Sequence, residues 1–110
     1  MVRENLGKYN GQRIVVSGKL EKSYKPGHNN CLIVDVVIRR DGKGEDHIWV
    51  CNNGGENNDL VRIVLEKGQR VGDEIVLRGV VNEYRKRGVV DYCIEDIDRV
   101  GVNGVNWKRN

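Results

Sequence analysis

The apolar residues of this chain recur at every second position, in short runs that glycines and polar stretches interrupt. A period of two is the spacing with which the side chains of a β-strand alternate between the faces of a sheet. In the first run, from Arg13 to Tyr24, Gly18 permits a bend. With that bend, Ile14, Val16 and Leu20 are all expected to face inward. The pattern predicts a small all-β domain in which helix is the minor component.

The segment from Cys31 to Arg40 is the predicted second strand, because it is rich in β-branched residues. Its central Asp35 marks the solvent side. The alternate residues are expected to face the core, namely Leu32, Val34, Val36 and Ile38.

His47 to Cys51 is a short third strand, on which Ile48 and Val50 share one face and Trp49 lies on the other. A polar stretch leads from it into LVRIVLEKG, residues 60–68, whose apolar residues have helical spacing and whose last glycine is a typical helix stop. Several of these residues are β-branched, which leaves a strand as the alternative interpretation.

Val71 to Tyr84, with an interior glycine at Gly79, is the predicted fourth strand, and Val89 to Val100 is the fifth. Only RKRG, residues 85–88, separates the two. Such a short connection joins antiparallel neighbours, so these strands are predicted to form a hairpin. Tyr92 follows the inward alternation of the fifth strand and is expected to belong to the core.

With 110 residues the chain is long enough for one hydrophobic core. We expect a single domain over residues 1–100 and a flexible, basic tail over residues 101–110. The apolar residues, 38% of the chain, form no run as long as a membrane span, and the first residues lack the apolar region of a secretory signal. These features predict a cytoplasmic protein without a membrane partner.

The cysteines, Cys31, Cys51 and Cys93, form no CxxC pair and match no familiar zinc spacing with His28 and His47. They are interpreted as buried free thiols, and neither a metal nor a cofactor is expected. The sequence also lacks a Walker A loop, a nucleophile elbow and an HExxH motif, so no enzymatic activity is predicted.

Two stretches carry a resemblance to a known family: YNGQRIVVSGKL, residues 9–20, and KGQRVGDEIVLRGVV, residues 67–81. Each places one glycine before a strand and another inside it. Over residues 9–100 the chain resembles the OB-fold family, and most closely its nucleic-acid-binding branch, which includes anticodon-binding-like domains and the modules of replication protein A. This resemblance implies a five-stranded Greek-key barrel with one short helix between strands three and four.

In an OB-fold, the loop between the first two strands and the loop between the last two flank the face of strands two and three, where oligonucleotides bind. Both loops of this chain combine tyrosine with lysine or arginine, and Trp49 is expected between them. Aromatic rings stack on bases, and cations contact phosphates. Stacking is assigned to Tyr24, Trp49 and Tyr84, and phosphate contact to Lys22, Lys25, Arg85, Lys86, Arg87 and, depending on strand register, Arg39 and Arg78.

These residues predict a single-stranded DNA-binding protein with little sequence preference, of the kind that serves replication or recombination. RNA is the alternative ligand, since stacking and phosphate contacts do not distinguish the two sugars. Charged hairpin tips also occur simply because they keep strand edges soluble. The fifth strand carries acids that would repel phosphates, namely Asp91, Glu95, Asp96 and Asp98. Those acids, or the tail with Trp107, would suit a different class of protein, an adaptor that binds another protein.

Overall fold

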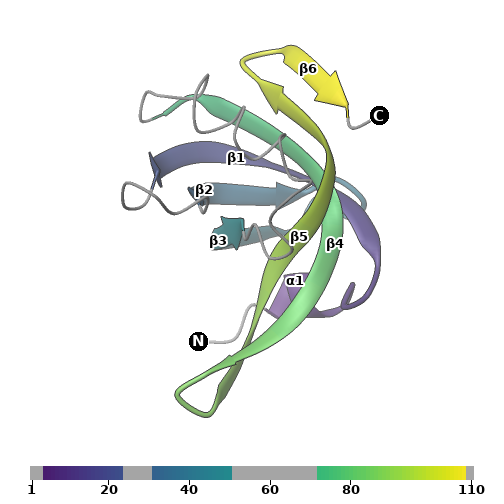
Figure 1. The fold of residues 1–110 in the computed structure, drawn as a ribbon, viewed down its shortest axis with the longest axis vertical. Coiled ribbons are helices and arrows are strands. Elements are labelled where there is room, and N and C mark those ends of the chain that lie inside the picture. Colours follow the sequence, from purple (N-terminus) through teal and green to yellow (C-terminus); the bar gives the residue numbers. More distant parts are fainter. Residues whose placement is uncertain (1–3, 24–30, 51–71, 109–110) are drawn as a thin grey trace.

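The computed structural model of the chain describes residues 4–23, 31–50 and 72–108, which fold into one short helix and six strands (Figure 1). The elements are α1 (Glu4–Gly7), β1 (Arg13–Ser23), β2 (Cys31–Ile38), β3 (Gly44–Val50), β4 (Glu74–Lys86), β5 (Val89–Val102) and β6 (Val105–Lys108). Within these ranges, no helix has the length and apolar character needed to cross a membrane.

Five of the strands close into a barrel. The strands β3, β2, β1, β4 and β5 are antiparallel neighbours in that order, and a parallel pairing of Val50 with Ile94 joins β3 to β5. The all-β, five-stranded OB-like barrel predicted from the sequence is confirmed. The helix predicted between strands three and four falls in residues 51–71, outside the described part of the chain, and the helix that is described, α1, precedes β1.

Alternate residues of the strands fill the barrel, because each β-strand turns every second side chain inward. Ile14, Val16 and Leu20 of β1 are buried, as are Ile48 and Val50 of β3. The predicted inward faces of these two strands are therefore confirmed.

The helix α1 packs against the barrel. Leu6 is fully buried in the core cluster, and a Cβ atom on Gly7 would lie only 2.6 Å from Cε2 of Tyr92. The ring of Tyr92 thus lies directly against the backbone of α1, where only glycine leaves enough room. Tyr92 is partly buried and packs on the core cluster, as the alternation predicts.

The inward face of β2 differs from the prediction. Val36 and Ile38 are buried as expected, but Leu32 and Val34 are only half-buried, and Ile33 is buried in their place. The placement of Leu32 and Val34 in the core was therefore wrong, and the first half of β2 presents them on the outside of the barrel.

A β-bulge causes this reversal. The register between β1 and β2 shifts between Ser17 and Lys19, so that an extra residue of β2 stands opposite Gly18. At the bulge, Asp35 has a φ of 52°, in the left-handed region. One extra residue moves the side-chain alternation by one position, so the residues on one side of the bulge exchange faces.

The pair β4 and β5 has a related irregularity with two extra residues. Between the pairs Arg78–Arg99 and Val80–Glu95, Gly79 stands opposite residues 96–98 of β5, and the φ of Asp96 is 51°. A Cβ atom on either Gly18 or Gly79 would lie 2.7 Å from a carbonyl oxygen of the neighbouring strand. The two glycines therefore allow the close backbone approach with which a small barrel coils its strands, as expected from their positions inside the first and fourth strands.

Within the described part of the chain, residues 101–108 form strands and a turn where a flexible tail is predicted. Residues 101 and 102 belong to β5, and β6 pairs antiparallel with it through residue 108. Asn103 and Gly104, with φ values of 48° and 88°, form the two-residue turn between them. Trp107 packs against the core cluster. A flexible tail over residues 101–108 is therefore ruled out by strand pairing, and Trp107 is part of the fold.

We predict that Gly18→Ala and Gly79→Ala each lower the free energy of unfolding by about 1–3 kcal/mol, because the added methyl group overpacks a backbone contact. Urea denaturation followed by circular dichroism measures the change. Ser17→Ala, which adds no atoms in the same strand, is the control. Wild-type stability in both glycine variants would mean that the barrel does not depend on these approaches.

Candidate nucleic-acid interface

The predicted β4–β5 hairpin is confirmed, and it projects beyond the barrel at the lower left of Figure 1. Lys86 pairs with Val89, and the turn consists of Arg87 and Gly88, with φ values of 53° and 77°. Positive φ at both turn residues suits the twist of a two-residue hairpin, and asparagine or glycine usually occupies the first position. Arginine at that position is unfavourable for the turn itself.

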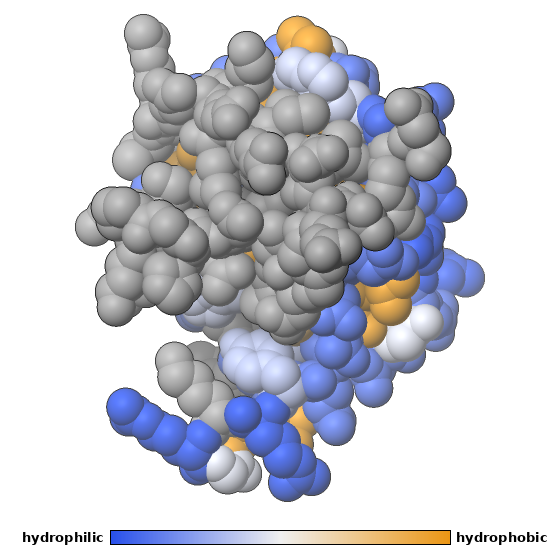
Figure 2. Space-filling model, viewed as in Figure 1, coloured by the Kyte–Doolittle hydropathy of each residue, from blue (hydrophilic) through white to orange (hydrophobic). Residues whose placement is uncertain are grey.

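The hairpin carries two exposed arginines whose partners can be examined within the described part of the chain. Arg85 and Arg87 are exposed, and among the described residues neither side chain forms an ion pair or a hydrogen bond. Lys86 is the last residue of β4, and the structure describes only its backbone. The projecting hairpin has a predominantly hydrophilic surface (Figure 2).

Tyr84 is half-buried at the base of this hairpin. Its hydroxyl donates a 3.3 Å hydrogen bond to Oδ2 of Asp91, the residue paired with it on β5. Oδ1 of Asp91 in turn accepts a 2.8 Å hydrogen bond from the backbone N–H of Tyr92. These bonds occupy one acid of the fifth strand and restrict the orientation of the Tyr84 ring.

Trp49 is half-buried on the outer side of β3, since its neighbours Ile48 and Val50 point into the core. The pairing of Val50 with Ile94 sets β5 beside β3, and β4 is the next strand. Tyr84 lies on the outer side of β4, in phase with the outward-facing residues of that strand. Trp49 and Tyr84 therefore both lie on the outer side of the barrel, with β5 between their strands.

The predicted first rim falls largely outside the described residues. Tyr24 and Lys25 belong to the range 24–30, and Lys22 is placed by its backbone alone, paired with Leu32. The assignment of these three residues to nucleic-acid binding stays a prediction.

Arg39 and Arg78 lie on a different part of the surface from Trp49. Together with Arg13 and Arg40 they surround a shallow pocket of about 280 Å³ on the outer side of β1 and β4. The backbone N–H of Arg39 donates a 3.0 Å hydrogen bond to the carbonyl oxygen of Val15 on β1. The residues assigned from the sequence thus divide between two surfaces, because the strand register determines where Arg39 and Arg78 face.

Two acids of β5 pair with arginines at this second surface. Oδ2 of Asp96 lies 2.6 Å from Nη2 of Arg13, and Oδ2 of Asp98 lies 3.3 Å from Nη1 of Arg13 and 3.7 Å from Nη1 of Arg78. These side chains are all partly exposed, so each pair contributes little to stability. Their effect is local, since arginines engage two of the four acids of β5 that would repel a phosphate.

Three cations near this second surface were missed by the sequence reasoning, namely Arg13, Arg99 and Lys108. Arg99 pairs with Arg78 on one side and with Lys108 on the other. A signal for this arrangement was present, since Asn103-Gly104 between valines is typical of a tight hairpin. Recognising that hairpin would have placed Lys108 beside Arg99.

The turn between β2 and β3, next to Arg39, is fixed by a polar cluster. The Tyr9 hydroxyl donates a 2.6 Å hydrogen bond to Oδ2 of Asp41, and the backbone N–H of Lys43 donates a 2.9 Å bond to Oδ1. The Arg40 guanidinium lies 5.8 Å from the centre of the Tyr9 ring. The hydrogen bond from Tyr9 is the main cause that holds the pKa of Asp41 below its ordinary value, and the bond from Lys43 is the next. The hydrogen bond to Asp41 also raises the pKa of Tyr9.

Tyr9→Phe is expected to raise the pKa of Asp41 toward its ordinary value, because the largest stabilisation of the carboxylate is removed. The pKa of the Asp41 carboxyl is lower in the folded than in the unfolded state. The carboxylate therefore stabilises the fold at pH values above its unfolded-state pKa, and this contribution is lost as pH falls through its folded-state pKa. An NMR titration of the Asp41 carboxyl carbon measures the shift, with Tyr84→Phe as the control. An unchanged Asp41 pKa in Tyr9→Phe would contradict this account of the turn.

Comparison of the chain with protein-family models, with curated proteins and with solved structures found no significant match.

Proposed function

We propose that this protein is an OB-fold protein that binds single-stranded nucleic acid, with single-stranded DNA as the ligand and little preference for sequence. The observation that carries the proposal is the projecting hairpin, where Tyr84 neighbours Arg85 and Arg87, two arginines without an ion-pair partner among the described residues; Trp49 lies on the outer side of the barrel two strands away.

A single strand offers two chemical features that this surface matches. Its phosphates attract the guanidinium groups, and its exposed bases stack on aromatic rings, each stacked base contributing about 1–3 kcal/mol. Neither contact reads the edge of a base, so such a surface accepts any sequence. In a duplex the bases are already stacked on one another, so the rings gain nothing from it.

The first prediction from this proposal is that oligo-dT quenches the fluorescence of Trp49, and that the affinity falls as salt rises. Trp107→Phe leaves Trp49 as the reporter, since the chain has 2 tryptophans. Oligo-rU and duplex DNA, titrated in parallel, test the ligand class. Affinity for duplex DNA equal to that for oligo-dT would argue against the stacking role of Trp49 and Tyr84.

The hairpin itself is tested by the double variant Arg85→Ala/Arg87→Ala. It should reduce the salt slope of log K by about 1.4, because each lost single-strand phosphate contact removes about 0.7. Lys8→Ala/Lys43→Ala removes the same charge from two exposed lysines that do not belong to the hairpin and is the matched control. Absence of binding to every oligonucleotide would refute the proposal and favour the adaptor class.

A third prediction separates function from folding at the turn. Arg87→Asn should raise the free energy of unfolding by about 1 kcal/mol, because asparagine tolerates the positive φ of this position. The same change should weaken binding to oligo-dT, since it removes a cation. Urea denaturation and the fluorescence titration measure the two effects. Equal or tighter binding by a stabilised Arg87→Asn protein would exclude Arg87 from the interface.

A further inference from the structure

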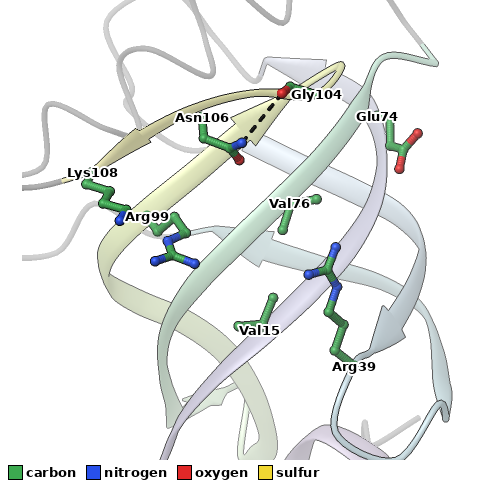
Figure 3. A pocket seen from close by; sticks show the side chains of 8 residues that line it. All are labelled: Val15, Arg39, Glu74, Val76, Arg99, Gly104, Asn106 and Lys108. Atoms are coloured by element: carbon green, nitrogen blue, oxygen red, sulfur yellow. Dashed lines mark hydrogen bonds between the residues drawn. The ribbon is translucent and has the colours of Figure 1, made fainter.

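The outer side of β1, β4, β5 and β6 carries a groove of about 530 Å³ (Figure 3). Arg39 stands on one side of it, and Arg99 and Lys108 stand together on the other. Between them lie Val15 and Val76, both half-buried. The groove therefore combines an apolar floor with cations on both sides.

The strand register lines these cations up across the sheet. Val15 pairs with Arg78, Arg78 with Arg99, and Arg99 with Lys108, while the backbone N–H of Arg39 is hydrogen-bonded to Val15. We call Arg39, Arg78, Arg99 and Lys108 the cation row. Four separate segments of the chain contribute one member each.

The next row of the sheet shows that the cation row faces outward. Val16 pairs with Leu77, Leu77 with Val100, and Val100 with Trp107. The first three of these side chains are buried, and Trp107 packs on the core cluster. Because successive residues of a strand point to opposite faces, the row next to this apolar one points away from the core.

Like charges on neighbouring strands repel one another, so a row of this kind is unfavourable unless anions balance it. Asp98 supplies one balancing carboxylate, 3.7 Å from Arg78. Among the described residues, Arg39, Arg99 and Lys108 form no ion pair. Glu74 is the only acid among the described residues that line the groove, and it points away from Arg99 and Lys108 in Figure 3. The charge of the row is thus least balanced at the groove.

The outer side of β4 connects this groove with the hairpin. Arg78, Val80, Asn82 and Tyr84 are alternate residues of the strand, and none of them belongs to the buried set. At about 3.3 Å per residue, Arg78 and Tyr84 are roughly 20 Å apart along the strand. A polymer lying on Tyr84 can therefore follow β4 to the cation row.

We infer that the cation row is a second phosphate-binding surface for the same single-stranded nucleic acid, which passes from the hairpin along β4 into the groove. This inference rests on the proposed function. The nucleic acid then follows a path over two sides of the barrel, and its phosphates lie between Arg39 on one side and Arg99 and Lys108 on the other. An oligonucleotide long enough to reach both surfaces binds more tightly than one that covers the hairpin alone.

The test compares oligo-dT of about 6 nucleotides, near the lower end of the range of about 4–16 nucleotides that one OB-fold covers, with oligo-dT of about 30, beyond its upper end. Arg99→Ala/Lys108→Ala should weaken binding of the long strand on the order of tenfold and reduce its salt slope by about 1.4, with little effect on the short strand. The hairpin variant Arg85→Ala/Arg87→Ala should weaken both. Lys8→Ala/Lys43→Ala, with the same loss of charge, should match wild type.

NMR provides a second readout that does not depend on a variant. The backbone amide signals of Val76 and Gly101, which lie beside the row, should shift with the long strand and not with the short one. If Arg99→Ala/Lys108→Ala binds the long strand like the lysine control and these signals stay fixed, the second surface is overturned while the hairpin interface stands. If the wild-type protein binds neither strand, the proposed function itself fails.

Discussion

The close approach of backbones at Gly18 and Gly79 is the constraint on which the rest of this structure depends. Five strands form a closed barrel only when some of them coil strongly, and β1 and β4 coil where a Cβ atom would meet a neighbouring carbonyl oxygen at 2.7 Å. Opposite each glycine the partner strand carries an aspartate with positive φ, Asp35 or Asp96. The same device is therefore used on both sides of the barrel, and it determines which residues face outward beyond it.

The bulge on β5 also explains how the chain separates its charges. Asp96 and Asp98 belong to the residues that stand opposite Gly79, and their carboxylates reach Arg13 and Arg78. The acids of β5 therefore balance the arginines nearest the bulge. A net charge of +3 is small for the whole chain, but within the described residues this local pairing leaves cations without an ion-pair partner at the hairpin tip and along the groove. The distribution of charge, more than its total, favours a polyanionic ligand.

Much of the fold followed from the alternation of apolar residues, because burial on one face imposes a period of two wherever the strand is regular. The five strands, the β4–β5 hairpin and the inward faces of β1 and β3 were predictable in this way. The inward face of β2 was not, since an extra residue at Asp35 reverses the alternation and leaves no trace in residue types. β6 was missed for another reason: its polar, glycine-containing sequence looks like a tail, although Asn103-Gly104 is a strong hairpin signal.

The candidate site was predictable where it depends on one local element and unpredictable where it depends on register. Tyr84, Arg85 and Arg87 are grouped by the hairpin alone, so the sequence was sufficient. Arg78 and Arg99 meet only because β4 and β5 resume pairing after the bulge in one particular register. That register is set by contacts between distant residues, with Gly79 and Ile97 among them. The close approach of Gly79 to β5 bends the barrel and also aligns the cation row. A substitution of Gly79 that prevents this approach would therefore change both the curvature of β4 and the spacing of the charges.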